Sequence, residues 1–379
     1  MDIKALIDKI FEKGRASGLE DMEVYYSAGT SLTLKVFQKE LETYNLSEGE
    51  GLSLRGVYRG KMGYSYTEKA DESSIDRLVK DVIENATIID SDDEEVIFEG
   101  SKEYKKVDSF NPSLSEVREE EKIEFVKKLE EEAFNLDDRI VSVQSCVYGD
   151  GSGETIMSNT KGLYLRDKSN IAYTYISVVA KEGEDIKTGL AYRTGNDFNK
   201  FYAKEIAREA VEEALALLGA SPVKSGDYKV IIRNSAAADL LEAFTGIFSA
   251  EAVQKNLSLL KGKLNEKIAS SVFTLVDDPY MEGGLASRSF DGEGVACKYK
   301  KVIDKGVLKT YLHNLKTAKK DGVETTGNAG KDSYKSSIGI SPSNFYVEKG
   351  ERNLNDMIAD TDKGILITEL QGLHSGLNS

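Results

Sequence analysis

One pattern of apolar spacing occurs twice in the first ~220 residues, and it restricts the possible folds more than any other feature. Each copy begins and ends with a segment whose apolar residues recur at i, i+3, i+4 and i+7, as on one buried face of a helix. The opening segments are 3–10 and 123–133, and the closing segments are 75–86 and 203–218. The pattern predicts two similar α+β units, although ordinary α+β patterning without a repeat is the alternative.

The strand-like runs between these helices follow the same order in both units. They cover residues 22–26, 32–37, 52–58 and 62–66 in the first unit and 141–148, 154–158, 163–167, 172–180 and 187–192 in the second. The run before each closing helix also matches, since Gly63-Tyr64-Ser65-Tyr66 corresponds to Gly189-Leu190-Ala191-Tyr192. We therefore expect one N-terminal domain, residues 1–222, whose halves span about 1–90 and 113–220 and whose strands form an antiparallel meander.

A domain boundary follows the second unit. Pro222 ends the preceding helix, because proline lacks the N–H that a helix interior needs. Beyond it, and most clearly over 277–328, glycine-rich corners alternate with short apolar runs, as in consecutive antiparallel strands. Strands are expected at 230–232, 272–276, 295–302 and 364–370, and helices near 235–248 and 313–320. The predicted fold class is therefore α+β, with an N-terminal domain of antiparallel sheet and helices and a mostly-β C-terminal domain, residues 223–379.

Charge and cysteine content restrict the partners and the compartment. The chain carries 50 Lys and Arg against 65 Asp and Glu, a net charge of −15. Nucleic-acid binding depends on clustered basic residues, so we expect no direct nucleic-acid partner. No apolar run is long enough to span a membrane, and the first residues do not read as a secretory signal, so no membrane partner is expected. Cys146 and Cys297 lie far apart, which suits a reducing cytoplasm.

Residue types alone name no reaction. The two histidines, His313 and His374, have no His, Cys or acidic partner at the spacing of a zinc site. A nucleophile elbow, a phosphate-binding loop and a dinucleotide fingerprint are all absent. The glycines at 283–284 and 292–294 are better explained as turns between strands. These residues therefore indicate no cofactor.

The stretch 277–328 and the segment Glu251-Ala252-Val253-Gln254-Lys255 resemble the TldD/PmbA family, long described as modulators of DNA gyrase and now as metallopeptidase components. The peptidase branch of that family carries a His-Glu-x-x-x-His helix, whose histidines bind the metal and whose glutamate activates water. The resemblance places Leu241 and Gly246 at the histidine positions and Glu242 at the glutamate. Leucine and glycine side chains offer no lone pair, so the resemblance implies no metal in this chain.

This substitution is what the PmbA/TldE branch of the family looks like. The resemblance therefore implies an intracellular, cytoplasmic metallopeptidase subunit that acts in peptide proteolysis with a TldD-like subunit, or with itself as a dimer. Zinc is expected only in the TldD-type partner, and the substrate is expected to be a peptide or unfolded polypeptide. The alternative is a non-catalytic peptide-binding or scaffold protein. Glu242 is either a vestigial catalytic residue or an ordinary solvent-facing or salt-bridged side chain.

The resemblance also implies residues that line a substrate cavity. They are Asp291, Gly292, Thr326, Gly327, Asn328 and His374, and for each an ordinary turn or structural hydrogen bond is the alternative. The family continues for several dozen residues beyond the segment that ends here at Ser379, and a cysteine in that continuation is the third metal ligand. We therefore expect a truncated C-terminal sheet with an exposed edge, which favours association with a partner.

Overall fold

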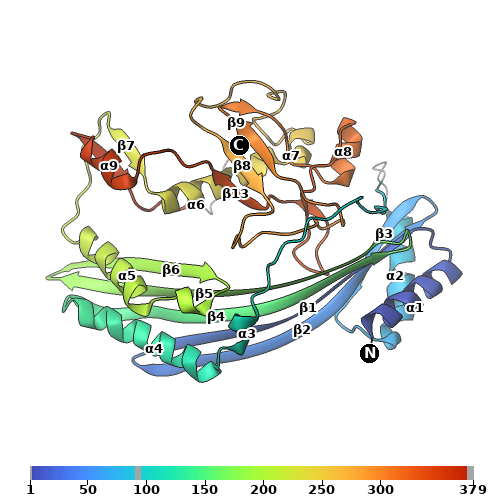
Figure 1. Ribbon diagram of the computed structural model, residues 1–379, viewed down its shortest axis with the longest axis horizontal. Helices are drawn as coiled ribbons and strands as arrows, with labels where there is room; N and C mark the ends of the chain where they lie inside the picture. Colours follow the sequence, from blue (N-terminus) through green and yellow to red (C-terminus); the bar gives the residue numbers. More distant parts are fainter. Residues whose placement is uncertain (1, 90–94, 374–379) are drawn as a thin grey trace.

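The N-terminal part of the chain forms a six-stranded antiparallel sheet in the computed structural model, which describes residues 2–89 and 95–373. The strand order is β3-β2-β1-β4-β5-β6, so β1 and β4 form the central pair (Figure 1). The strands are β1 (Met22–Phe37), β2 (Glu40–Tyr58), β3 (Lys61–Thr67), β4 (Ile140–Asn159), β5 (Tyr164–Glu182) and β6 (Asp185–Gly195). The α+β fold class predicted from the sequence is confirmed, because helices and an antiparallel sheet make up this part.

The strands are longer than the apolar alternation predicts. The runs 22–26 and 32–37 belong to one strand, as do 141–148 and 154–158, and also 163–167 and 172–180. The prediction of separate short strands was therefore wrong. The stretches between these runs are rich in small polar residues and glycine, and they stay in register; Gly29, for example, pairs with both Gly49 and Gly153. Alternation fails there because these midsections do not contribute to either of the two apolar cores of the sheet.

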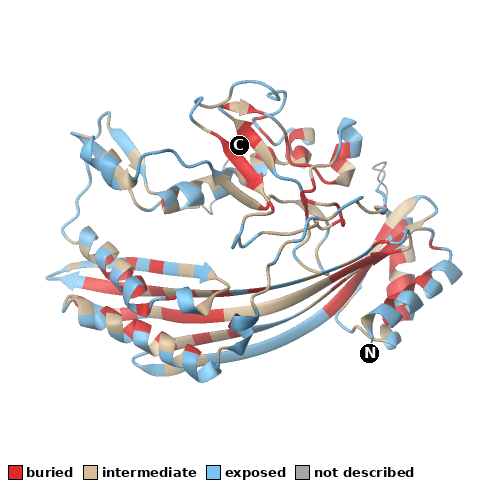
Figure 2. Ribbon diagram, in the orientation of Figure 1, coloured by how far each residue is buried: buried red, intermediate tan, exposed pale blue. Residues whose placement is uncertain are grey.

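Each end of the sheet is covered by its own pair of helices. Helices α1 (Ile3–Ala16) and α2 (Ile75–Ile88) bury Leu6 and Val82 against one end. Helices α4 (Glu119–Leu136) and α5 (Ala203–Leu217) bury Leu129 and Ala210 against the other. Figure 2 shows buried residues concentrated under both pairs. The two cores are separate clusters, and each fully buried Leu or Val contributes about 1.5–3 kcal/mol.

The matching glycines before the closing helices have the same packing role. A side chain on Gly63 would overlap the carbonyl oxygen of Val82 in α2, and one on Gly189 would overlap that of Ala210 in α5. Only glycine lets the third strand of each half approach the helix backbone this closely. The similarity of the two short sequences therefore reflects one helix-on-strand contact made twice.

The register of the central strands relates the two halves by an approximate twofold. The order helix, three strands, helix occurs in both halves, and β1 pairs with β4 in antiparallel register. Thr30 lies opposite Ser152, and their hydroxyl groups are 3.1 Å apart. The sequence offset that relates Thr30 to Ser152 also relates Ser47 in β2 to Ser169 in β5. Equivalent positions of the halves can therefore be compared directly.

The C-terminal part contains smaller sheets joined by irregular segments. A four-stranded antiparallel sheet has the order β10-β9-β8-β13, β7 pairs in parallel with β14, and β11 pairs with β12. The strands are β7 (Lys229–Ile232), β8 (Leu275–Asp278), β9 (Lys300–Asp304), β10 (Val307–Leu308), β11 (Ala329–Gly330), β12 (Gly339–Ile340), β13 (Asn344–Val347) and β14 (Gly364–Ile367). The remaining helices are α3 (Pro112–Glu116), α6 (Asn234–Phe244), α7 (Ala250–Gln254), α8 (Leu315–Asp321) and α9 (Leu354–Ala359), with 3-10 turns at Glu72–Ser74, Phe198–Lys200 and Thr245–Phe248.

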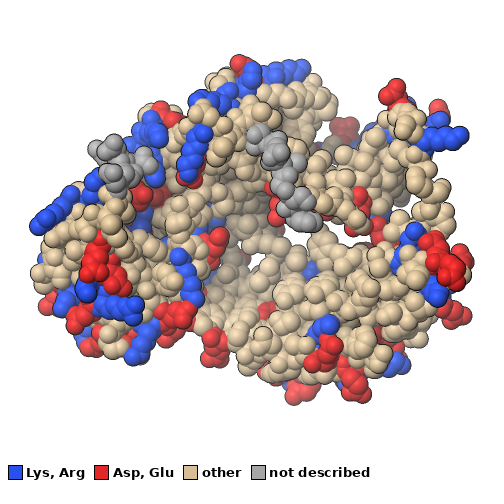
Figure 3. Space-filling view, turned by 180° about the vertical axis from the view of Figure 1, so that it is seen from behind, with Lys and Arg blue, Asp and Glu red and all other residues tan. Residues whose placement is uncertain are grey.

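The segment between the two halves fastens the C-terminal part to the sheet. Tyr104 Oη donates to the Gly294 carbonyl at 2.7 Å, and Ser109 Oγ donates to the Ser287 carbonyl at 3.1 Å. We call residues 95–111 the connector. From behind, the C-terminal part and the sheet leave an opening between them (Figure 3). Within the described ranges 2–89 and 95–373, no helix has the length and hydropathy to cross a bilayer.

Candidate functional site

Five of the six residues predicted to line a substrate cavity do meet in space, but in a buried network. Asp291 is only 3% exposed, and its carboxylate accepts hydrogen bonds from the N–H groups of Glu293 at 2.9 Å, Val295 at 3.0 Å and Ala329 at 2.9 Å. Burial raises the pKa of Asp291, and the three N–H donors offset part of that rise. Gly292 joins the same strand corner, since its N–H donates to the Ala329 carbonyl at 2.8 Å.

Asn328 and Thr326 lie in the neighbouring part of this network. The Asn328 amide donates to Asp277 at 2.8 Å, and Lys300 Nζ lies 2.7 Å from the same carboxylate. Burial opposes ionisation of Asp277, yet Lys300 and the hydrogen bonds from its neighbours hold its pKa below the usual value. Thr326 Oγ1 accepts the His313 N–H at 2.7 Å. These contacts fix one loop against another, which is a structural role.

None of these five residues lines the cavity at the 280–288 loop or the cavity beside β2 that are described below. Gly327 is held at φ +70°, and a side chain there would approach the Ala296 carbonyl oxygen at 2.9 Å. Contact with substrate therefore stays a prediction for Asp291, Gly292, Thr326, Gly327 and Asn328. His374 lies outside the described residues.

Helix α6 and the 3-10 turn Thr245–Phe248 that follows it carry the positions at which the resemblance placed a metal site. Glu242 and Gly246 are exposed, and Leu241 is half-buried against the C-terminal core. Among the apolar residues of this segment, Leu240, Leu241, Phe244, Ile247 and Phe248, only Phe248 is buried. A single carboxylate beside leucine and glycine does not fit a catalytic zinc ion, which usually takes three protein ligands.

Metal ligands do not gather elsewhere in the described part of the chain. Among residues 2–89 and 95–373, no group of three or more His, Cys, Asp and Glu side chains is placed to hold an ion. His313 is buried, and burial lowers its pKa. Cys297 is also buried, and burial raises the pKa of its thiol to about 11. The Cys297 thiol therefore stays protonated and is a poor nucleophile. His313 is kept neutral, but it belongs to no group of three possible ligands in the described part of the chain.

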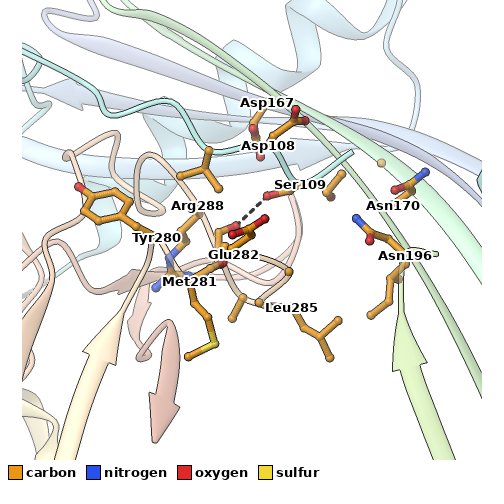
Figure 4. Close-up of a pocket in the computed structure, with 18 of the residues that line it drawn as sticks. Asp108, Ser109, Asp167, Asn170, Asn196, Tyr280, Met281, Glu282, Leu285 and Arg288 are labelled. Atoms are coloured by element: carbon orange, nitrogen blue, oxygen red, sulfur yellow. Dashed lines mark hydrogen bonds between the residues drawn. The ribbon is translucent and has the colours of Figure 1, made fainter. Parts of the chain in front are cut away.

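A cavity of about 590 Å³ lies between the sheet, the connector and the loop 280–288 (Figure 4). Its floor is the small-residue midsection of β4 and β5, and its opposite wall is the loop. The lining includes Lys105, Asp108, Ser109, Gly151, Ser152, Gly153, Asp167, Ser169, Asn170, Asn196, Met281, Glu282, Leu285 and Arg288. Because the glycines have no side chain, the backbone of a ligand could approach this floor closely.

The cavity combines charges of both signs with hydroxyl and amide groups. Asp108 from the connector and Asp167 from β5 lie side by side at one end, and burial raises the pKa of Asp167. Arg288 donates to the carbonyls of Ser341 at 3.2 Å and Pro342 at 3.3 Å, which fixes its position. The lining contains no histidine and no cysteine. This chemistry suits binding of a polar, extended ligand and does not supply a nucleophile with its base.

A buried charge cluster, Glu23, Arg55, Glu293 and Lys331, joins the sheet to the C-terminal part. Arg55 Nε donates to Glu23 at 3.0 Å, and its Nη1 lies 3.8 Å from Glu293. Lys331 Nζ lies over the Tyr25 ring at 5.0 Å from its centroid. Burial lowers the pKa of Lys331 to about 8. The sequence patterns predicted neither this cluster nor the cavity. For the cavity, the available signal was the interrupted apolar alternation in β4.

Comparison with known proteins agrees with this architecture along the whole chain. Residues 22–86 match domain 1 of the PmbA/TldA metallopeptidase family, 112–218 match its central domain, and 225–379 match its C-terminal domain. A metalloprotease of Methanocaldococcus jannaschii is 28% identical over 374 residues, which cover 97% of this chain and 80% of that protein. The metalloprotease PmbA of Escherichia coli O157:H7 is 24% identical over 366 residues, covering 94% and 78%.

Solved structures show the same fold. A Thermotoga maritima protein named as a modulator of a DNA gyrase superposes with a TM-score of 0.91 at 32% identity, covering 99% of this chain and 84% of that one. TldE from Thermococcus kodakarensis superposes with a TM-score of 0.90 at 24% identity, covering 97% and 83%. With all three family domains matched in order, this chain belongs to the PmbA/TldA metallopeptidase family.

Proposed function

We propose that this chain is a PmbA/TldE-like subunit of an intracellular, cytoplasmic metallopeptidase, without a metal site of its own, that acts with a TldD-type partner in peptide proteolysis. The observation that carries the proposal is the set of donor atoms offered by α6 and the 3-10 turn after it. Leu241 and Gly246 have no donor atom, and Glu242 alone cannot hold a catalytic ion. Zinc and the activated water would then belong to the partner, and this chain would help to enclose and position the peptide.

The partner surface in this proposal is the outer face of β7, β14 and α6. Val230 is 51% exposed, and Ile232 and Phe244 are exposed as well. These residues belong to neighbouring elements, since β7 leads into α6 and pairs with β14. Val230 and Ile232 lie on one face of β7 by strand alternation, and exposed apolar residues of this kind are found at protein–protein contact sites. A specific interface there would bury about 1,200 Å² or more in total.

A non-catalytic peptide-binding or scaffold protein is the second candidate. The cavity at the 280–288 loop favours this function, because its lining offers polar groups that can bind a ligand but no nucleophile with its base for hydrolysis. The two functions differ in what a partner adds. Only the first predicts that hydrolysis appears when both chains are present.

The test is a reconstitution with a TldD-type protein. Peptide hydrolysis is measured for each chain alone and for the mixture, and zinc is measured in each chain after dialysis. The proposal expects activity only, or far more, in the mixture and zinc only in the partner. Binding of peptide without any gain in hydrolysis would favour the scaffold function. Hydrolysis by this chain alone, with zinc bound, would exclude both.

A further inference from the structure

The first half of the sheet has an open edge. Strand β2 pairs with β1 along its whole length, but β3 covers only Leu52–Tyr58 on its other side. In the described part of the chain, no strand or isolated bridge pairs with Glu40–Gly51 on that side. Figure 2 shows this margin of the sheet as exposed, and Tyr44 and Leu46 are 46% and 52% exposed. An edge of this length presents a row of unpaired N–H and C=O groups.

The equivalent edge in the second half is occupied by a segment of this chain. Strand β6 covers β5 only from Ala172 onward, and the earlier part of β5 is met by the connector. Ser109 forms a parallel bridge with Ser169, and the Asn170 N–H donates to the Ser109 carbonyl at 3.2 Å. The Asn170 amide exchanges further hydrogen bonds with the Asn111 backbone at 2.7 and 2.8 Å. The sheet therefore accepts an extended segment at this position.

By the twofold relation, the open edge of β2 is equivalent to the edge of β5 that the connector occupies. Ser47 in β2 is the counterpart of Ser169 in β5. No described residue forms a bridge to Ser47 equivalent to that from Ser109 to Ser169. Because the relation preserves the direction of equivalent strands, a segment at Ser47 would run parallel to β2. Main-chain hydrogen bonds to a sheet edge provide affinity for any extended peptide, and the side chains beside the edge provide selectivity.

The side chains beside Ser47 are acidic. A cavity of about 930 Å³ opens there, lined by Glu48, Glu50, Glu68 and Glu154 with Lys168 as the one basic residue in its lining. Glu154 is paired with Arg166 and Glu68 with Lys335. Among residues 2–89 and 95–373, Glu48 has no ion-pair partner, and the Glu50 carboxylate accepts a hydrogen bond from Tyr26 at 2.9 Å. By strand alternation Glu48 and Glu50 lie on one face, while Gly49 leaves room on the other.

We propose that the β2 edge around Ser47–Glu50 binds an extended peptide carrying lysine or arginine side chains, aligned parallel to β2. The carboxylates of Glu48 and Glu50 select the basic side chains, and the strand edge binds the peptide backbone. The same carboxylates oppose a second copy, because two such edges would bring like charges together. This inference rests on the proposed function for the peptide as ligand, but binding here needs neither metal nor partner.

The experiment measures binding to the full chain alone by fluorescence anisotropy. The probe is a labelled octapeptide of alternating Lys and Val, and the charge-reversed probe alternates Glu and Val. A third peptide keeps the Lys residues but carries N-methyl groups along its central backbone, so it keeps its charge and loses strand pairing. We expect binding of the first peptide only, with slower amide exchange of residues 45–51 in its presence.

The matched variants separate site binding from general attraction to an acidic protein. Glu48→Gln/Glu50→Gln is expected to weaken binding about two- to thirtyfold, the range for two surface charge contacts. Glu12→Gln/Glu20→Gln removes the same charge from exposed positions in and after α1 and is expected to change nothing. Equal binding of the N-methylated peptide, or of the Glu48/Glu50 variant, would overturn the proposal.

Two further outcomes would also overturn it. Protection of a region other than 45–51 would place the peptide elsewhere, and protection of 45–51 in a dimer without peptide would show a second copy at the edge. Since the readout is binding to this chain alone, failure here is distinct from failure to support hydrolysis with a TldD-type partner.

Discussion

Arg55 Nε donates to the Glu23 carboxylate at 3.0 Å across neighbouring strands, and both side chains are almost fully buried. One Glu23 oxygen and the Ser53 hydroxyl have no hydrogen-bond partner in the described part of the chain. The pair lies where the C-terminal part meets the sheet, because Glu293 approaches the same guanidinium. A buried ion pair contributes little net stability, but removal of one member leaves an uncompensated charge.

Arg55→Met should therefore lower the free energy of unfolding by about 3–5 kcal/mol, since Glu23 and Glu293 would remain buried without their cation. Urea unfolding measures the change. Arg77→Met is the control, because Arg77 pairs with Asp81 at the exposed surface of α2 and should cost at most about 1 kcal/mol. Similar losses in the two variants would mean that the buried cluster does not stabilise this junction.

The pH dependence of stability should contain a contribution from Glu293. Burial raises the pKa of this carboxyl from 4.5 to about 7, against the opposing effect of Arg55. The folded chain thus retains a proton that the unfolded chain has released, so the contribution is fully present below about pH 4.5 and is lost as the pH rises through about 7. Lys331 acts at higher pH: burial lowers its pKa from 10.5 to about 8, so its unfavourable contribution fades as the pH rises from about 8 to 10.5.

Glu293→Gln tests the first contribution, because the amide can still accept the Leu315 N–H, now 2.8 Å from the carboxylate. The difference in unfolding free energy between wild type and variant should decrease from pH 4.5 to 7 and then level off. Urea unfolding at several pH values gives this difference. A difference that is constant across the range would mean that Glu293 titrates normally in the folded chain.

The two close-approach glycines should be equally intolerant of a methyl group. Gly63→Ala and Gly189→Ala would each push a helix away from the sheet, and we expect each to lower the unfolding free energy by about 1–3 kcal/mol. Gly49→Ala is the matched control, since a side chain there meets nothing within 4 Å. If the three variants have the same unfolding free energy, helices α2 and α5 can move away from the sheet without a loss of stability.

The purified chain should contain no stoichiometric zinc after dialysis. Leu241 and Gly246 offer no ligand, and a structural zinc site worth about 10–16 kcal/mol of apparent binding would survive that treatment. Elemental analysis provides the measurement. One zinc per chain would contradict the proposed division of roles between the two subunits.

A charge on the exposed face of β7 should prevent association with a TldD-type partner. Val230→Asp leaves the N-terminal sheet untouched and places a carboxylate in the proposed apolar contact. Sedimentation of the mixture should change from complex to separate chains, while the far-UV spectrum of the variant stays the same. Val223→Asp, also exposed but in the linker before β7, is the control. Complex formation by both variants would place the interface elsewhere.

Apolar spacing located the helices well, because a helix that covers a sheet must bury one face. Leu78 and Val82, four residues apart, are both buried as the pattern requires. The middle of the long strands was not predictable in this way, since Gly29 and Gly153 leave no apolar signal where neither core reaches. The ion cluster was invisible for another reason: Arg55 and Glu293 are far apart in sequence, and charged residues in strands are ordinarily exposed.

The candidate site could also be predicted only in part from the sequence. The resemblance grouped Asp291 with Asn328, and the two lie in one region, where the Asp291 carboxylate accepts the N–H of the residue after Asn328. Their contact with a substrate stays a prediction. Their burial could not be foreseen, because exposure depends on which loops pack above them. Asp108 and Asp167 gave no signal at all, as isolated carboxylates are common on surfaces.

The separation of the two apolar cores has a mechanical consequence. Each end of the sheet is stiffened by two helices, whereas the span through Thr30 and Ser152 belongs to neither core. The helices thicken both ends of the sheet and make them stiffer than the span between them. We therefore expect changes in the curvature of the sheet to concentrate in that span. The cavities at 280–288 and beside Ser47 both border it. A change in the curvature of this span would therefore alter both cavities while both cores keep their packing.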